Sequence, residues 1–266
     1  MGSADIRIAF LLTLIAGLST GIGSLIAFVA SRTNKKFLCY SLGLSAGVMI
    51  YVSFMEMLPN GKEELTAIFG ERLGVLYQLL AFLGGMALIT VIDFIVPESG
   101  NPHEMHGVEE MSVKDPLHRA GFVVALSIAI HNFPEGIATF TSALGGIDVA
   151  IPITIAIAIH NIPEGIAVSV PIYHATGSRK KAFGYSFLSG LAEPAGALIA
   201  YLFLMPFWTP SVNGIVLSAV SGIMVFISLD ELLPSAEKYG EHHLSIAGLV
   251  SGMAVMGLSL FLFAAG

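Results

Sequence analysis

Two near-copies of one motif carry the residues of this chain that are best able to do chemistry: HNFPEGIA, beginning at His131, and HNIPEGIA, beginning at His160. Each copy places a histidine, an asparagine and a glutamate around a proline in otherwise apolar sequence. Residues four apart lie on one face of a helix, so His131 shares a face with Glu135. The same spacing places His160 beside Glu164. The motifs therefore predict two helix faces that each present an imidazole and a carboxylate.

Turned toward each other, these faces would supply the ligands of a divalent transition metal. The connecting segment is short, which favours adjacent antiparallel helices. Imidazole suits Zn, Fe, Co, Ni and Cu, and carboxylates neutralise part of the ion's charge. Asn132 and Asn161 lie about 100° round the helix from the histidines, where their carbonyl oxygens could bind a second ion bridged by the glutamates. Glu193, which precedes Pro194 in a later apolar stretch, could complete this second position.

A purely structural role is the alternative for each of these residues. A single buried histidine is usually a hydrogen-bonded core residue, and a single glutamate in a membrane helix can pair with a neighbour. However, a charge at the bilayer centre costs at least ~2.5–3.5 kcal/mol on insertion scales and is functional by default. Two copies of the same polar set therefore favour metal binding over structural hydrogen bonding.

The proline and glycine of each motif predict the shape of its helix. Pro134 and Pro163 have no N–H and push against the carbonyl four residues earlier, which predicts a bend in both helices. A membrane tolerates such a break where protein or a water-filled cavity satisfies the freed carbonyl. Gly136 and Gly165 permit a close approach of a neighbouring backbone.

Several other polar side chains are weaker candidates. Four carboxylates lie near predicted helix ends, where they either reach water or line an ion pathway: Glu56, Asp93, Asp230 and Glu231. Met49 offers a soft thioether to the site region, although methionine is more often a packing residue. His103 and His106, in the polar segment NPHEMHGVEEM, either handle metal loosely on the cytoplasmic side or belong to a solvated acidic loop.

The elements that must position these residues are membrane-spanning helices. Of the 266 residues, 55% are apolar and only 12% are charged, which is about half the charged share of an ordinary soluble domain. A helix needs about 20 predominantly apolar residues to cross a bilayer. Eight stretches satisfy this, at roughly 6–30, 37–58, 73–96, 119–143, 148–174, 182–205, 211–234 and 244–265. We expect an all-α membrane protein with one polytopic domain over residues 1–266 and a cytoplasmic His/acid loop at about 97–119.

The distribution of charge predicts the orientation. Eight spans put both termini on one side, and nine of the twelve basic residues fall in loops on the opposite side. The positive-inside rule then places both termini outside the cytoplasm. The first apolar stretch is too long for the core of a signal peptide, so we expect a retained helix. The net charge of −7 argues against a nucleic-acid partner and fits a cationic one.

A second repeat relates two of the predicted spans. GVMIYVSFMEMLP begins at Gly47 and GIMVFISLDELLP begins at Gly222, with Gly, Met, Ser, Glu and Pro at equivalent positions. In the predicted orientation these segments run in opposite directions, as they do in the inverted repeats of transporters. The compositional bias of membrane helices is the alternative explanation.

With these motifs the chain resembles the ZIP (Zrt/Irt-like) family of metal transporters, and is closest to its bacterial members. The resemblance extends over the whole chain and includes SGLAEPAGA in the sixth predicted span and DELLP in the seventh. It implies that four residues bind a first, transported ion at mid-membrane: His131, Glu135, His160 and Glu164. It implies that three more share the two motif glutamates around a second ion: Asn132, Asn161 and Glu193.

The family resemblance also implies the cargo and the location. Members move Zn²⁺, and often Fe²⁺, Mn²⁺ or Co²⁺, into the cytoplasm, and we add Cd²⁺ to the expected ions. The protein would be a multi-pass protein of the bacterial inner or plasma membrane, with metal bound as substrate and no cofactor. The expected partners are divalent metal ions and the lipid bilayer, and the sequence leaves a homodimer open.

Two alternatives to a carrier are a metal-selective channel and an intramembrane metalloenzyme. Sequence alone does not separate the channel from the carrier. The enzyme would need HExxH or ExxH spacing with an open coordination position, and neither spacing occurs in the motifs. We therefore expect a transport protein and no enzymatic activity.

Overall fold

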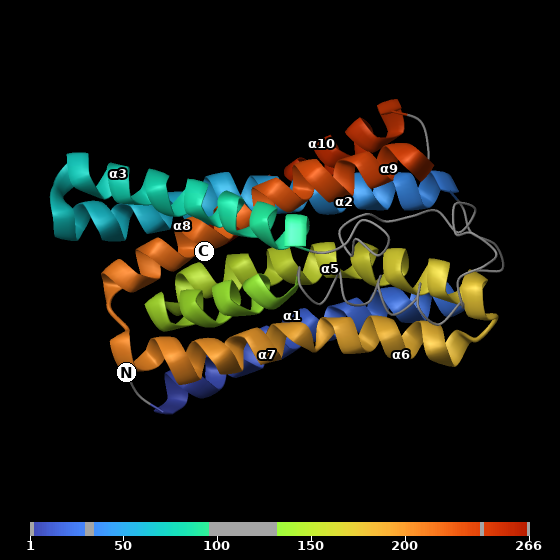
Figure 1. The fold of residues 1–266 in the computed structure, drawn as a ribbon, viewed down its shortest axis with the longest axis horizontal. Coiled ribbons are helices and arrows are strands. Elements are labelled where there is room, and N and C mark those ends of the chain that lie inside the picture. The colour runs from blue at the N-terminus through green and yellow to red at the C-terminus, as the bar shows by residue number, and fades with distance from the viewer. Residues whose placement is uncertain (1–2, 30–34, 96–131, 240–241, 265–266) are drawn as a thin grey trace.

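A computed structural model of the protein describes residues 3–29, 35–95, 132–239 and 242–264 (Figure 1). Within these ranges every regular element is helical. The longer helices are α1 (Ser3–Val29), α2 (Lys35–Val52), α3 (Leu58–Ile95), a helix over residues 132–145, α5 (Ile147–Thr176), α6 (Arg179–Gly190), α7 (Ala192–Ile199), α8 (Pro210–Ile227), α9 (Leu233–Tyr239) and α10 (His242–Ala264). Short π-helical turns, η1 (Ser53–Met57), η3 (Ala200–Leu204) and η5 (Ser228–Leu232), and a 3₁₀ turn, η4 (Met205–Phe207), link some of them.

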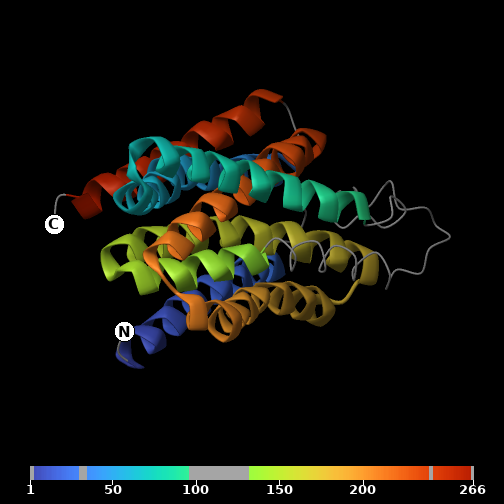
Figure 2. The ribbon, with the colours of Figure 1, turned by 60° about the vertical axis from the view of Figure 1, so that its left-hand side comes forward.

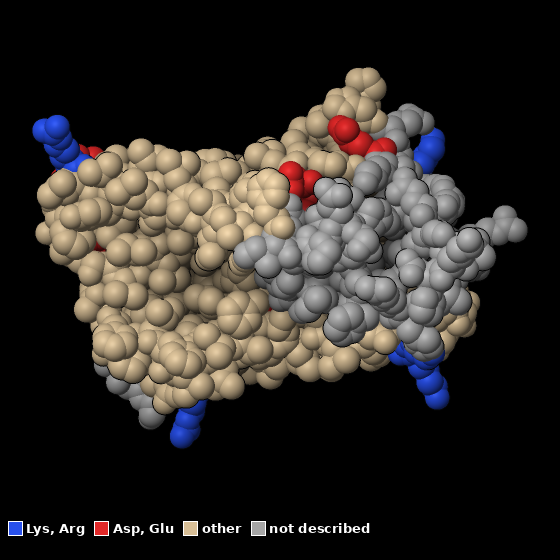
Figure 3. Space-filling model, viewed as in Figure 1, with Lys and Arg blue, Asp and Glu red and all other residues tan. Residues whose placement is uncertain are grey.

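The outer surface of this helical bundle is apolar. Six helical stretches in the described residues are long and apolar enough to cross a membrane. Large apolar side chains such as Leu80 of α3 and Leu262 of α10 are exposed on it. On the face shown in Figure 3, Lys and Arg appear only near the two ends of the molecule. The predicted class, an all-α multi-pass membrane protein, is confirmed.

The longest apolar stretch, Lys36–Ile92, turns back on itself at Gly70. Gly70 has φ 75° and ψ 163°, a conformation that glycine adopts without strain. After the turn, a Cβ at Gly74 would lie only 2.6 Å from the Cα of Thr66, so the two arms of α3 run back alongside each other. The second arm corresponds to the predicted span 73–96.

The first arm of α3 differs from the prediction, because the helix does not end at residue 58. It continues through Pro59, and the π-helical turn η1 ends at Met57, two residues before that proline. A proline cannot bond the carbonyl four residues earlier and crowds it, and a wider turn relieves both problems. The turns η3 and η5 precede Pro206 and Pro234 in the same way.

At the second motif the helix continues on both sides of the proline. α5 runs without interruption from Ile147 to Thr176 and therefore passes through Pro163. One proline removes one backbone hydrogen bond, while close packing against α1 and α2 holds the rest of α5 in place. A break in the α-helical assignment occurs between α6 and α7, at Leu191, three residues before Pro194. In the first motif, the residue four before Pro134 lies outside the described ranges.

The helices pack in two groups that mix the chain order (Figures 1 and 2). In the first group, α1 packs mainly against α5, α6 and α7, and the helix over 132–145 contacts α5 and α7. In the second, α2 packs against α10 and α3 packs against α8. The main contact between the groups is that of α2 with α5. The motif glutamates and His160 lie in the first group.

Candidate metal centre

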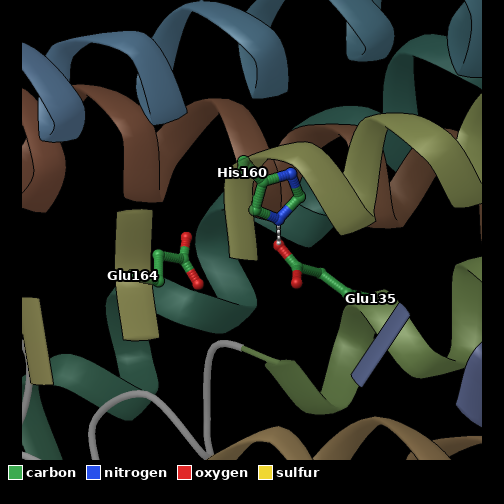
Figure 4. A group of neighbouring side chains, drawn as sticks. All are labelled: Glu135, His160 and Glu164. Atoms are coloured by element: carbon green, nitrogen blue, oxygen red, sulfur yellow. Dashed lines mark hydrogen bonds and ion pairs between the residues drawn. The ribbon is translucent and has the colours of Figure 1, made fainter. Parts of the chain in front are cut away.

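Three buried side chains of the two motifs meet inside the bundle (Figure 4). Glu135 comes from the helix over 132–145, and His160 and Glu164 come from successive turns of α5. One ligand atom from each of the three lies within 4.8 Å of the other two. Their side chains point into the same space, and none is more than 1% exposed. The predicted approach of the two motif helices is confirmed for these residues.

The hydrogen bonds of His160 fix which of its nitrogens is available to a metal. Nδ1 lies 3.0 Å from the carbonyl oxygen of Ala156, which can only accept, so Nδ1–H is the donor. Nε2 lies 2.9 Å from Oε1 of Glu135. Nε2 is therefore the imidazole nitrogen that faces the carboxylate and is left for a metal ion. A metal ion at this place could bind both Nε2 of His160 and Oε1 of Glu135.

A residue outside the motifs also contacts this cluster. Ser45 of α2 is completely buried, and its Oγ lies 3.3 Å from Oε1 of Glu164 and 3.4 Å from the carbonyl oxygen of His160. Its hydroxyl can donate to either oxygen and so connects the second helix group to the ligands. Sequence analysis did not single out Ser45. Its only signal is a position four residues before Met49, on the same helix face.

The three residues predicted to bind a second ion, Asn132, Asn161 and Glu193, are all buried near the two motif helices. The Asn161 amide donates to Oε1 of Glu193, and to the carbonyl oxygen of Ala16 at 3.0 Å. The Asn132 amide donates to the carbonyl oxygen of Ser189 at 3.5 Å. Glu193 is fully buried in the first turn of α7. These contacts place both asparagines and Glu193 around the motif helices, as the prediction required.

The two asparagine side-chain oxygens give an independent test of whether a cation fits. Oδ1 of Asn132 and Oδ1 of Asn161 are buried and have no hydrogen-bond partner within the described residues. Burying a polar oxygen without a donor costs about 1–3 kcal/mol, and a bound cation would remove that penalty. Ligands of one tetrahedral zinc lie roughly 3.3–3.6 Å apart, so small side-chain shifts from the observed cluster would suffice.

The remaining predicted residues have different environments. Met49 is completely buried in the core, Glu56 is half-buried and accepts from Asn60, and Asp230 is exposed whereas Glu231 is buried. The backbone of Asp93 belongs to α3, and nothing further is described for its side chain. Three predicted histidines lie outside the described residues: His103, His106 and His131.

Similarity to known proteins identifies the kind of protein that holds this site. Residues 97–260, more than half of the chain, match the family model described as ZIP Zinc transporter. The chain belongs to the ZIP family. The family classes it with transporters rather than enzymes, as the sequence motifs predicted.

Relatives named "Zinc transporter ZupT" are similar to this ZIP chain over almost its whole length. The protein of Clostridium perfringens is 59% identical over 276 residues, which cover 97% of each chain. That of Streptococcus mutans is 61% identical over 256 residues, covering 96% of this chain and 97% of the relative. That of Oceanobacillus iheyensis is 59% identical over 266 residues, covering 98% and 99%. The predicted likeness to bacterial members of the family is confirmed.

Proposed function

We propose that this ZIP-family chain carries divalent metal ions, Zn²⁺ foremost, across the cell's inner or plasma membrane into the cytoplasm. The observation that carries the proposal is the buried group of Glu135, His160 and Glu164 within a membrane helix bundle. Two carboxylates and an imidazole are ligands that Zn²⁺ prefers, and Fe²⁺, Mn²⁺, Co²⁺ and Cd²⁺ can share them. The zinc named in the titles of the relatives supports the same cargo.

The proposed site holds two ions. Glu135, His160 and Glu164, joined by His131, bind the transported ion, which enters as substrate and not as a cofactor. Asn132, Asn161 and Glu193 share the motif glutamates around the second. The support for this second position is the contact of Asn161 with Glu193 and the two asparagine oxygens described above.

Eight membrane spans with both termini outside are part of the proposal. Six stretches qualify by length and composition, the turn at Gly70 divides one of them into two, and the helix over 132–145 would end a further span. The start of α1 and the end of α10 lie toward the same end of the bundle in both ribbon views (Figures 1 and 2). The excess of basic residues in the loops predicted for the opposite side supports the orientation.

An inverted repeat is supported by equivalent packing of the second helix group. A Cβ at Gly47 of α2 would overlap the carbonyl oxygen of Leu249, and a Cβ at Gly222 of α8 would overlap that of Phe82. Both acceptors lie three residues before the GMA tripeptide of their own helix. The π-helical turns η1 and η5 also begin at equivalent positions of the repeat. Two copies of one packing arrangement are what an inverted repeat produces.

Uptake of radioactive zinc by proteoliposomes tests the proposal directly. We expect uptake that saturates, rises steeply with temperature, and is reduced by Fe²⁺, Mn²⁺, Co²⁺ and Cd²⁺ in competition. Flux that does not saturate and depends weakly on temperature would favour the channel. Uptake no greater than that of protein-free liposomes would refute transport.

Acidity should inhibit this uptake, because protons compete with the metal for the ligands. As the pH falls, protons occupy the imidazole and carboxylate ligands for a larger share of the time, and the metal must then displace them. We expect the zinc concentration for half-maximal uptake to rise as pH falls, measured with equal pH on both sides of the membrane. An unchanged half-maximal concentration between pH 7.5 and pH 5.5 would contradict a histidine-containing site.

A further inference from the structure

The helices around the metal ligands have a local two-fold arrangement. Gly17 of α1 and Gly190 of α6 face each other, and a Cβ on either glycine would overlap the carbonyl oxygen of the other. This contact is reciprocal: the same kind of overlap occurs in both directions. Reciprocal contacts indicate a two-fold axis between the two helices.

The same axis relates the two motif helices. A Cβ at Gly165 of α5 would overlap the carbonyl oxygen of Thr20, and a Cβ at Gly136 would overlap that of Glu193. Gly136 and Gly165 hold the same place in the two motifs. Thr20 and Glu193 each stand three residues after a glycine of the reciprocal contact. Thr20 on α1 is therefore the counterpart of Glu193 on α7.

A second pair of contacts has the same symmetry. A Cβ at Gly23 of α1 would overlap the carbonyl oxygen of Ile162, and a Cβ at Gly196 of α7 would overlap that of Phe133. Phe133 and Ile162 both follow the HN pair of their motif. The axis is thus supported by three pairs of contacts, at residues 17, 20 and 23 and at residues 190, 193 and 196, and not by a single close approach.

The asparagine hydrogen bonds follow this axis as well. Asn161 donates to the carbonyl oxygen of Ala16, and Asn132 donates to that of Ser189. Ala16 and Ser189 each directly precede a glycine of the reciprocal contact. Asn161 additionally donates to Glu193, whose symmetry counterpart is Thr20.

Thr20 and Asn132 approach the same turn of α6 and leave two oxygens without partners. A Cβ at Gly190 would lie 3.1 Å from Oγ1 of Thr20, while Asn132 bonds the adjacent Ser189. Thr20 is fully buried, and within the described residues neither its Oγ1 nor Oδ1 of Asn132 has a hydrogen-bond partner. A hydroxyl and an amide oxygen left unsatisfied in this way can coordinate a cation.

We infer that Thr20 and Asn132 mark a symmetry-related position that a divalent cation would occupy if residue 20 were a carboxylate, and that the residue at position 20 therefore decides on which side of the axis the second ion binds. The inference rests on the proposed binuclear site. A hydroxyl and an amide carry no charge, whereas Glu193 brings a carboxylate that neutralises part of the ion's charge. The ion therefore binds beside Glu193, and a carboxylate at position 20 would make the other side equivalent.

Zinc stoichiometry of purified protein in detergent, measured by equilibrium dialysis, tests this. We expect two ions in the wild type, one in Glu193→Gln, and two again in the double variant Thr20→Glu with Glu193→Gln. The matched control, Thr20→Gln with Glu193→Gln, should stay at one ion because glutamine adds no charge. One ion in a folded double variant would overturn the inference but leave the binuclear proposal intact. One ion in the wild type would refute the binuclear proposal, and the inference with it.

If Thr20→Glu prevents folding, a smaller substitution at position 20 tests the same inference. Thr20→Cys with Glu193→Gln changes little volume and puts a thiolate at the same place. With Co²⁺, this variant should show a cobalt–thiolate charge-transfer band that Glu193→Gln alone, which still contains Cys39, does not show. A folded protein without that band would overturn the inference.

Discussion

Zinc uptake is expected to fall to the protein-free background when Glu164 or Glu135 is replaced by alanine. Each carboxylate belongs to the buried group whose ligand atoms lie within 4.8 Å of one another. Removing even a residue that only supports a ligand typically costs about 10–100-fold in metal affinity, and the loss of a ligand should exceed that. The measurement is the initial rate of radioactive zinc uptake by proteoliposomes.

A carboxylate far from the site serves as the matched control for this loss. Glu71 is exposed and pairs with Lys62 at 3.0 Å, next to the turn at Gly70. Surface ion pairs of this kind contribute about 0–1 kcal/mol, so Glu71→Ala should leave the uptake rate within about twofold of the wild type. Normal uptake by both Glu135→Ala and Glu164→Ala would rule out the assigned site.

Substitution of Gly165 by valine should prevent α1 from packing on α5. A Cβ at Gly165 would overlap the carbonyl oxygen of Thr20, and backbone cannot move aside as a flexible side chain can. Overpacking a tight core typically costs about 1–3 kcal/mol, and a clash between two backbones should be at the upper end or beyond. We expect a large fall in the melting temperature in detergent and little correctly folded protein, measured by fluorescence-detected size exclusion after heating.

The same change at Gly84 provides the comparison. A Cβ at Gly84, on the second arm of α3, meets nothing within 4 Å. Gly84→Val should therefore fold and melt close to the wild type. Equal melting temperatures for Gly165→Val and Gly84→Val would contradict the close approach of α1 and α5 at Gly165.

Much of the site could be predicted because its information is local. The spacing of His160 and Glu164 requires only a helix to place them together, and the short connection at Gly146 requires only that the motif helices be neighbours. The class of fold followed from apolar length, since few structures can satisfy their backbone inside a bilayer.

What sequence did not reveal depends on contacts between distant segments. Ser45 contacts Glu164 from a helix more than a hundred residues earlier. No motif in the sequence around Ser45 indicates that its hydroxyl has a functional role. Thr20 becomes the counterpart of Glu193 only when α1 is seen beside α6. α5 continues through Pro163 although proline disfavours a helix locally, because the packing of the neighbouring helices holds it in place.

The buried position of the three ligands His160, Glu135 and Glu164 means that the membrane voltage acts on metal binding. An entering Zn²⁺ that displaces one proton from these ligands raises the charge of the site by one unit and not by two. Each unit charge moved through 100 mV changes the free energy by about 2.3 kcal/mol. Exchange of a Zn²⁺ ion for a proton would thus halve the electrical work of loading at a given depth, so zinc binding should depend on the resting potential half as steeply as it would without the exchange.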